Sequence, residues 1–413
     1  MNKTNTISLN ILLLVSVLCI WSFMSAFSFN GIVMASVCFA FEVFAVLLQR
    51  GIIGLKKVYI VFFLPILIFF FYANSLAKYV LAFNFVYVIL SFAFILTDCY
   101  AEKLDYKAIL KCLLSFSLFS IIFVVFEHLF KGPMARVLSA LLSGEYKAAA
   151  LNTLIKGEEY AALAAGCNIV AFSCAILILY ALFIYNNSVI KKVMLVVISL
   201  YVIAIIGQRS NFITIPFCVS LTFYFQQRSG KIKRALQIIL ILLSVLLLFA
   251  FLSPFLSRFS TVSYVFSSLD RFSNGVDIMS GRNYSYERAI SLWKESPIIG
   301  HGWYYFYINN AGIIRRGVNS HVHNLALELL CDCGILGAIV VFTPIIYMIG
   351  KNVRVLMDKT RTENKSLYQF TLGIQLFFLA DSFLHVTFYN IGMIIIYYVV
   401  LLIFNIYYGR NRI

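Results

Sequence analysis

The chain has 413 residues, of which 62% are hydrophobic and only 12% are charged. A soluble globular protein is about 45–50% apolar, so this composition excludes a soluble domain and indicates an integral membrane protein. The formal net charge of +16 would suit a nucleic-acid-binding protein, but the positions of the basic residues exclude that function.

Stretches of about 20 mostly apolar residues, long enough to cross the hydrocarbon core of a bilayer, recur along the whole chain. We expect the first to be retained, because it is long for the apolar core of a signal peptide and no clear cleavage site ends it. The pattern predicts an all-α polytopic protein, with residues 1–413 forming a single integral membrane domain among lipids. About twelve spans are predicted: 7–28, 30–49, 58–77, 79–97, 109–127, 162–185, 190–207, 210–227, 235–257, 324–349, 367–386 and 388–408.

The basic residues gather in alternate connections between these stretches. If the N-terminus lies inside, most of the 33 lysines and arginines fall in connections that also lie inside. This distribution follows the positive-inside rule. It predicts that both termini are cytoplasmic and that the basic excess serves topology. The nine cysteines lie mostly within apolar stretches, and we expect them to be small buried residues.

Two outside segments are long. Residues 128–161 are amphipathic and are predicted to lie along the membrane surface. Residues 258–323 form the longest polar stretch, a large loop between the predicted ninth and tenth spans. Outer loops of this length are usually functional. All five histidines are predicted at or beyond outer helix ends: His128, His301, His321, His323 and His385.

The large loop contains two local signals. Apolar residues at Tyr286, Ile290 and Trp293 have the spacing of a short helix. The following Pro297–Trp303 segment, with glycines at positions 300 and 302, is predicted to be a turn.

Three arginines are candidates for an anion site. Arg209 interrupts an apolar stretch at an outer helix end, where it either snorkels to the interface or binds an anion. Arg282 and Arg288 lie six residues apart in the large loop and are either solvated or ligand-binding. A guanidinium grips phosphate with two parallel hydrogen bonds and keeps its charge. Two or three such groups could therefore hold a diphosphate without a metal ion.

The histidines near residue 320 are candidates for proton transfer. His323 precedes Asn324 at the start of a predicted helix, where a histidine is either a helix-end residue or a general base. His321 would point to the same side along an extended backbone and could orient His323.

Four further residues on the predicted helix that follows are expected to support the site. Gly334 returns to the direction of His323 after eleven residues at about 100° each, and Gly334 and Gly337 would let neighbouring backbones approach. Glu328 and Asp332, four residues apart, are expected to be partners inside the bundle.

Several motifs are absent from the sequence. It contains no D-x-D, no H-E-x-x-H and no phosphate-binding G-x-x-x-x-G-K-[ST] loop. We therefore expect neither a metal ion nor ATP, and no cofactor.

These residues together resemble the O-antigen ligases and O-antigen polymerases, the Wzy-like superfamily. Ser320, His323, Asn324, Gly334 and Gly337 resemble its histidine signature. The run from Gly281-Arg282 through Trp293 to Pro297, Gly300 and Gly302 resembles its arginine–proline–glycine run, and Gly207–Ser210 resembles its short arginine motif, with Ile213 in place of the usual leucine. The resemblance covers roughly residues 200–350.

The resemblance implies a GT-C-like glycosyltransferase in the bacterial inner membrane with a periplasmic active site. Such enzymes take a glycan from undecaprenyl diphosphate and pass it to the lipid A–core (ligases) or to another lipid-linked repeat unit (polymerases), without ATP or a metal ion. It assigns Arg209 and Arg282 to the diphosphate and His323 to the acceptor hydroxyl. Arg288, His321 and Asn324 are predicted substrate-binding residues, and the roles of Arg315 and Arg316 stay open.

A ligase is our first interpretation and a polymerase the alternative. A transporter or flippase is a remote alternative, because no inverted repeat or broken helix is evident in the sequence. The sequence does not identify the sugars, the anomeric outcome or the oligomeric state.

Overall fold

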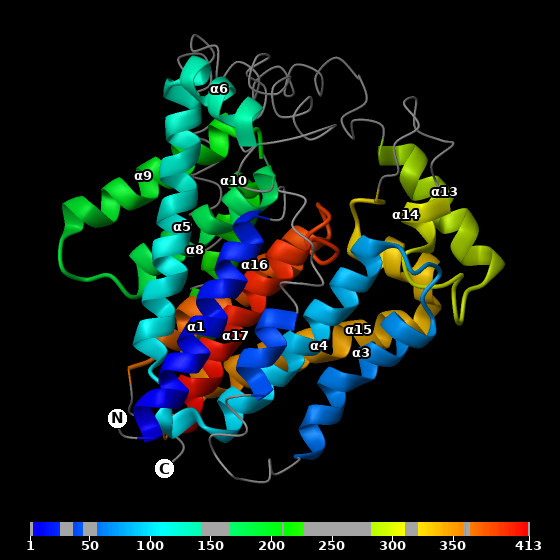
Figure 1. Cartoon of the computed structure of the whole chain (residues 1–413), viewed down its shortest axis with the longest axis horizontal. Helices are drawn as coiled ribbons and strands as arrows, with labels where there is room; N and C mark the ends of the chain where they lie inside the picture. The colour runs from blue at the N-terminus through cyan, green and yellow to red at the C-terminus, as the bar shows by residue number, and fades with distance from the viewer. Residues whose placement is uncertain are drawn as a thin grey trace.

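The computed structural model describes residues 3–24, 36–43, 56–141, 166–208, 210–226, 282–309, 321–358, 360 and 364–411. Within these ranges the chain is helical, and its extended pairing is limited to a parallel bridge between Ala73 and Trp303 (Figure 1). The all-α prediction is confirmed for this part of the chain.

Within the described ranges, four helices are long and apolar enough to cross a membrane: α4 (Lys78–Cys99), α5 (Tyr106–Leu129), α15 (Leu325–Met357) and α17 (Ile391–Arg410). The remaining described helices are α1 (Lys3–Met24), η1 (Lys57–Tyr59), α3 (Ile60–Phe71), η2 (Ala101–Lys103), α6 (Lys131–Leu141), α8 (Cys167–Phe183), α9 (Val189–Ile205), α10 (Asn211–Gln226), α13 (Arg282–Glu295), α14 (Tyr305–Asn309) and α16 (Ser366–Ser382).

Most of the predicted spans coincide with these helices. The span predicted at 30–49 is described only at 36–43, and the one at 235–257 lies outside the described residues. The count of twelve therefore stays a prediction. The amphipathic segment predicted at 128–161 is described only to residue 141, where it forms the end of α5 and α6.

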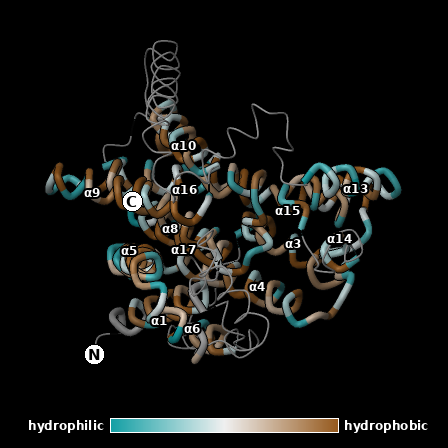
Figure 2. Tube along the Cα trace, turned by 90° about the horizontal axis from the view of Figure 1, so that it is seen from above, coloured by the Kyte–Doolittle hydropathy of each residue, from teal (hydrophilic) through white to brown (hydrophobic). Residues whose placement is uncertain are grey.

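Helix α17 forms the centre of the bundle. It packs against α1, α4, α5 and α16, and every residue from Gly392 to Ile406 is buried. A helix that is apolar all round belongs in such a core. Outer helices expose large apolar side chains instead, as a surface facing lipid requires; examples are Leu67 and Phe71 of α3, Phe119 and Ile122 of α5, and Val193 and Val197 of α9. Figure 2 shows hydrophobic residues running through the central helices and α3.

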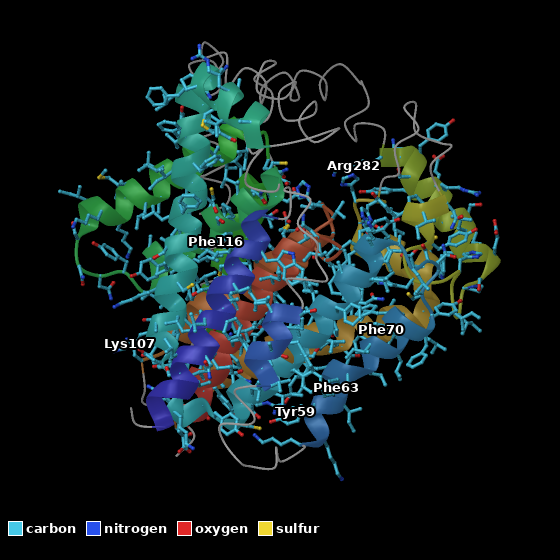
Figure 3. All side chains as sticks on the ribbon, in the orientation of Figure 1. Tyr59, Phe63, Phe70, Lys107, Phe116 and Arg282 are labelled. Carbon is cyan, nitrogen blue, oxygen red and sulfur yellow. The ribbon has the colours of Figure 1, made fainter. Side chains whose placement is uncertain are left out.

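The bundle has two chemically different ends. At one end, Lys56 pairs with Asp98, and Nε of Arg410 donates to the carbonyl of Ala101 at 3.3 Å. Figure 3 shows Lys107 and Tyr59 toward this end and Arg282 toward the other, which we call the α13 end. The start of α1 and the end of α17 lie at the end opposite α13 (Figure 1).

Helix α15 is broken at Gly334, which has φ 64° and ψ −168°. Residues Pro297–Gly302 fill the break: the amides of His301 and Gly302 donate to the carbonyls of residues 331 and 332 at 3.1 and 2.6 Å, and the amides of residues 335 and 336 donate to the carbonyls of Pro297 and Ile298. The prediction of an unbroken helix was therefore wrong, and with it the alignment of Gly334 with His323. The predicted turn is present at residues 297–299, where Ile298 and Ile299 are exposed, and the chain then runs inward to Trp303, which is fully buried.

Helix α13 confirms the short helix predicted in the large loop. Its buried residues are Ala289 and Leu292, with Tyr286 partly buried, so the face turned to the protein differs from the predicted one. The cause is a small second core, where Ala289 and Leu292 pack with Phe306, Val322 and Cys331. This core holds α13 against α15. It thereby sets the position of Arg282 at the start of α13 relative to His323, just before α15.

Candidate functional site

Three segments that are distant in sequence meet at the α13 end. Nη1 of Arg282, the first residue of α13, donates to the carbonyl of Leu384 at 2.8 Å. Oγ of Ser210, just before α10, lies 2.6 Å from Nε2 of His385. Ser210, Arg282, His323, Asp381 and His385 are called the histidine–arginine cluster below. The connection between α16 and α17, which contains Leu384 and His385, is the common support of the cluster.

His323 lies directly before the N-cap residue of α15. Its backbone has φ 60°, an unusual value for a residue with a side chain, and the left-handed turn ends the approach to the helix. Its Nδ1 is buried and has no hydrogen-bond partner among the residues that the structure describes. Burial first, then the positive charge of Arg282 and the rings of His321 and His385, lower the pKa of His323 to about 3. The imidazole is therefore neutral near pH 7 and has a nitrogen free to take a proton.

His385 is anchored on two sides. Its side chain is 11% exposed, and its Nε2 lies 2.6 Å from Oγ of Ser210 and 3.7 Å from Oδ1 of Asp381. Oγ1 of Thr387 donates to the other oxygen of Asp381 at 2.5 Å. Burial and then the charge of Arg282 lower the pKa of His385 to about 4.

The arrangement of Ser210 and Asp381 around the ring of His385 differs from that of a nucleophilic triad. In a triad the carboxylate binds one ring nitrogen and the serine the other. Here both face Nε2, so the carboxylate does not orient the ring for proton removal from Ser210. The arrangement anchors two segments to each other and does not activate a serine.

His321 is held by a buried carboxylate. Its Nδ1 pairs with Glu328, whose other oxygen accepts the amide of Val322 at 3.1 Å. Its ring stacks on Tyr307 with centroids 4.4 Å apart. The expectation of an extended approach was wrong because φ of His323 is positive, so His321 and His323 do not follow the alternation of a strand.

Asp332 holds the inserted segment from inside α15. Its two oxygens accept the amides of Tyr304 and Phe306 at 3.1 and 2.9 Å, and the hydroxyl of Tyr389 donates to it at 2.9 Å. Glu328 and Asp332 thus bind different groups, and the prediction that they are each other's partners was wrong. The carboxylate joins α15, α14 and the connection before α17.

The other predicted site residues have separate positions. Asn324 is the N-cap of α15, where its Oδ1 accepts the amide of Leu327 at 3.1 Å. Arg288 is exposed on α13. It is not among the described charged residues that lower the pKa of His323. Arg209, Arg315 and Arg316 lie outside the described residues, although Gln208 and Ser210 on either side of Arg209 are described.

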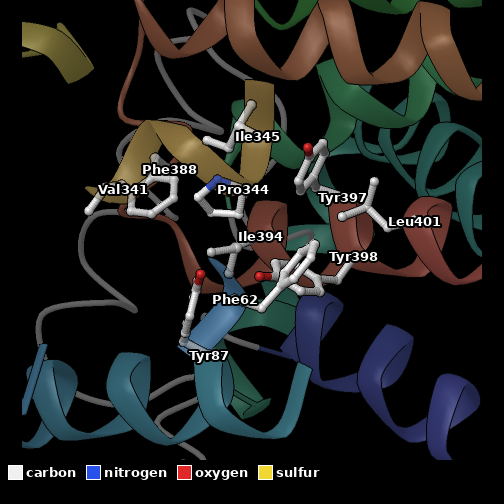
Figure 4. A pocket seen from close by; sticks show the side chains of 10 residues that line it. All are labelled: Phe62, Tyr87, Val341, Pro344, Ile345, Phe388, Ile394, Tyr397, Tyr398 and Leu401. Atoms are coloured by element: carbon white, nitrogen blue, oxygen red, sulfur yellow. The ribbon is translucent and has the colours of Figure 1, made fainter. Parts of the chain in front are cut away.

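A small pocket in the bundle core does not coincide with the cluster. It lies between α15, α17, α3 and α4, and its volume is about 10 Å³ (Figure 4). Within the described ranges, no three His, Cys, Asp or Glu side chains gather as metal ligands would. The expectation that no metal is used stays a prediction. The pocket is lined by Phe62, Tyr87, Val341, Pro344, Ile345, Phe388, Ile394, Tyr397, Tyr398 and Leu401.

The sequence interpretation missed three parts of the cluster: Ser210, His385 as its partner, and the carbonyl of Leu384. Polar residues at Asp381 and His385 between two apolar stretches were a usable signal, because an ionisable group at membrane depth usually has a partner. The identity of that partner was not encoded locally, since Ser210 and His385 are 175 residues apart.

Comparison with known proteins gives one positive finding. No curated protein matches the chain. Residues 193–342, from α9 to the middle of α15, match the family model described as O-antigen ligase. This region contains Arg282, His321 and His323. The match covers less than half of the chain and supports the predicted resemblance to the O-antigen ligase and polymerase (Wzy-like) superfamily.

Proposed function

We propose that this protein is an O-antigen ligase of the bacterial inner membrane. It transfers a glycan from undecaprenyl diphosphate to the lipid A–core of lipopolysaccharide at the periplasmic face, without ATP or a metal ion. The main support is the convergence of Arg282 and neutral His323 beside the α16–α17 connection at one end of the bundle. The match to the O-antigen ligase family supports the same reaction class.

The proposed reaction is a single displacement at the anomeric carbon of the donor sugar. The oxygen of the acceptor hydroxyl forms the new glycosidic bond, and the bond from the anomeric carbon to the diphosphate oxygen breaks. Undecaprenyl diphosphate leaves with the electron pair, and His323 takes the hydroxyl proton. The energy comes from the glycosyl diphosphate, so ATP is not required.

Arg282 and Arg209 are the proposed partners of the diphosphate. Negative charge develops on the leaving oxygen, and positioned cationic donors lower the barrier because they need no reorganisation. Arg288, His321 and Asn324 stay predictions as substrate contacts. His321 and Asn324 flank His323 in sequence, and each is held by a contact with the first turns of α15. We propose that these contacts set the position of His323.

The polymerase alternative differs in the acceptor. Its donor bond and its leaving group are the same, so the histidine–arginine cluster would suit both reactions. A transporter is less consistent with the structure: α15 is broken, as in many transporters, but residues 297–302 supply hydrogen-bond partners for the backbone groups at the break.

The test is a reconstituted transfer reaction. Purified protein is mixed with undecaprenyl-diphosphate-linked glycan and lipid A–core, with EDTA and without ATP, and products are followed by mass spectrometry. Product should form, and His323→Ala should lower the rate by about 10²–10⁴-fold, the usual contribution of a general base. His128→Ala is the matched control, because His128 lies at the end of α5, beside the ring of Tyr201.

Each outcome has a clear meaning. Full activity of His323→Ala would reject the proposed base. Chain extension of the lipid-linked glycan, with no transfer to lipid A–core, would identify the polymerase. Movement of the intact lipid-linked glycan across vesicles without bond formation would identify a flippase.

A further inference from the structure

The α16–α17 connection binds both arginine-bearing segments of the site. Leu384 accepts Arg282, and the next residue, His385, contacts Ser210. Ser210 is the neighbour in sequence of Arg209. Two adjacent residues of one short connection therefore bind a residue just before α10 and the first residue of α13, which lies within the large loop.

The connection itself is fixed to the bundle. The amides of Leu384 and His385 donate to the carbonyl of Asp381 at 3.0 and 2.8 Å, and Thr387 donates to the Asp381 carboxylate. Asp381 is buried near the end of α16. The imidazole of His385 thus projects from a rigid base, and its contact with Ser210 has a defined position.

Gln208, two residues before Ser210, is anchored as well. Nε2 of Gln208 donates to Oδ1 of Asn168 at the start of α8, at 3.0 Å. Gly207 has φ 73°, which turns the chain away from α9. Gln208 is therefore held by Asn168, and Ser210 is held by His385.

We propose that His385 is a positioning residue of the transfer reaction: by contacting Ser210 it holds the start of α10 beside the connection that also binds Arg282. This inference rests on the proposed function, because it gives the diphosphate site a geometry. His385 does not act on the substrate itself, since its Nε2 is already engaged by Ser210. Positioning is costly to lose: a displacement of about 1 Å can lower a rate by about 10²-fold.

Two variants of His385 separate positioning from simple structural loss. The amide nitrogen of glutamine reaches approximately the place of Nε2, whereas asparagine is too short. His385→Gln should keep kcat within about threefold of wild type. His385→Asn should lower kcat by about 10–100-fold and change the donor KM little, because the transition state depends on the geometry more than the ground state does. His128→Asn is the control for the same chemical change.

A double-mutant cycle tests whether His385 acts through Ser210. Ser210→Ala should lower kcat about as much as His385→Asn. The double variant should be no worse than either single variant, because each change removes the same Ser210–His385 contact. The same non-additivity should appear between His385→Asn and Arg209→Ala. Thermal melting of each variant in detergent checks that the fold is retained.

Several results would overturn the inference. They are equal losses in His385→Gln and His385→Asn, independent losses in His385→Asn and Ser210→Ala, or wild-type kcat in His385→Asn. His323→Ala is assayed in parallel. If it is inactive while His385→Asn is fully active, only the positioning role fails; if His323→Ala is fully active, the proposed function fails as well.

Discussion

His323 is neutral for two physical reasons. It is largely buried, and Arg282 lies close enough for its positive charge to disfavour a second cation. A base with a pKa near 3 holds a proton weakly in the free protein. An anionic diphosphate beside Arg282 would reverse the local field and raise the pKa of His323 toward its ordinary value of about 6.5. Substrate binding would therefore create a competent base.

The pH dependence of the transfer rate tests this coupling. The acid limb of kcat/KM reports the free protein and that of kcat reports the complex. We expect the kcat limb to lie at least about one pH unit above the kcat/KM limb, because bound diphosphate raises the pKa of His323. Rates measured from about pH 2 to pH 8, over a range of donor concentrations, give both limbs, because the free-protein limb is expected near the pKa of about 3 of His323.

Arg282→Gln provides the matched comparison. It removes the positive charge that lowers the pKa of His323, so the kcat/KM limb should move to higher pH. A kcat limb at or below the kcat/KM limb in the wild-type protein would contradict the coupling.

At the scale of elements, the break in α15 explains why glycine is required at positions 300 and 334. Without water in the membrane, backbone groups freed by a broken helix need partners within the protein. Residues 297–302 supply those partners, and the two backbones touch: a Cβ at Gly334 would lie 2.3 Å from the carbonyl carbon of Ile298, and one at Gly300 would lie 2.5 Å from the amide nitrogen of Cys333. Only glycine fits at either contact. The insertion connects α13 to α15 and so connects Arg282 to His323.

Substitution of Gly334 tests this contact. Gly334→Ala should destabilise the protein by more than about 2 kcal/mol, because the added Cβ meets backbone and the left-handed φ is unfavourable for alanine. Gly350→Ala in the same helix is the control: a Cβ there meets nothing within 4 Å, so it should be neutral or slightly stabilising. Thermal melting in detergent measures both, and equal melting temperatures would reject the close packing.

At the scale of the whole molecule, the contacts divide the bundle into two ends. The amide of Asp105 donates to Oγ of Ser8 at 3.4 Å, which places the start of α5 beside the start of α1, at the end where Arg410 closes α17. The histidine–arginine cluster lies at the α13 end. This order is the one that the positive-inside rule requires if the cluster is periplasmic.

Reporter fusions test the proposed sidedness. Fluorescent-protein fusions after Asp105 and Asp358 should fluoresce, since that protein folds inside the cell. Alkaline phosphatase fusions after Lys131 and Glu295 should be active, since that enzyme needs the outside. Phosphatase activity after Asp105, or fluorescence after Glu295, would contradict the topology.

The sequence by itself determined the helical membrane fold, the helix at α13 and the residue types of the site. These follow from hydropathy, from periodicity and from the chemistry of single side chains such as Arg282 and His323, all of which are local properties. The family resemblance predicted over residues 200–350 was likewise confirmed as far as residue 342, because it rests on spacing along the chain.

Only the tertiary structure decided which groups meet. The insertion of residues 297–302 into α15, the pairing of His321 with Glu328 and the contact of Ser210 with His385 depend on backbones and side chains brought together from distant segments. Hydropathy carries no information about such polar partners, because each partner occupies an ordinary position in its own segment. The positive φ values of His323 and Gly334 likewise depend on residues that pack against them from distant parts of the chain.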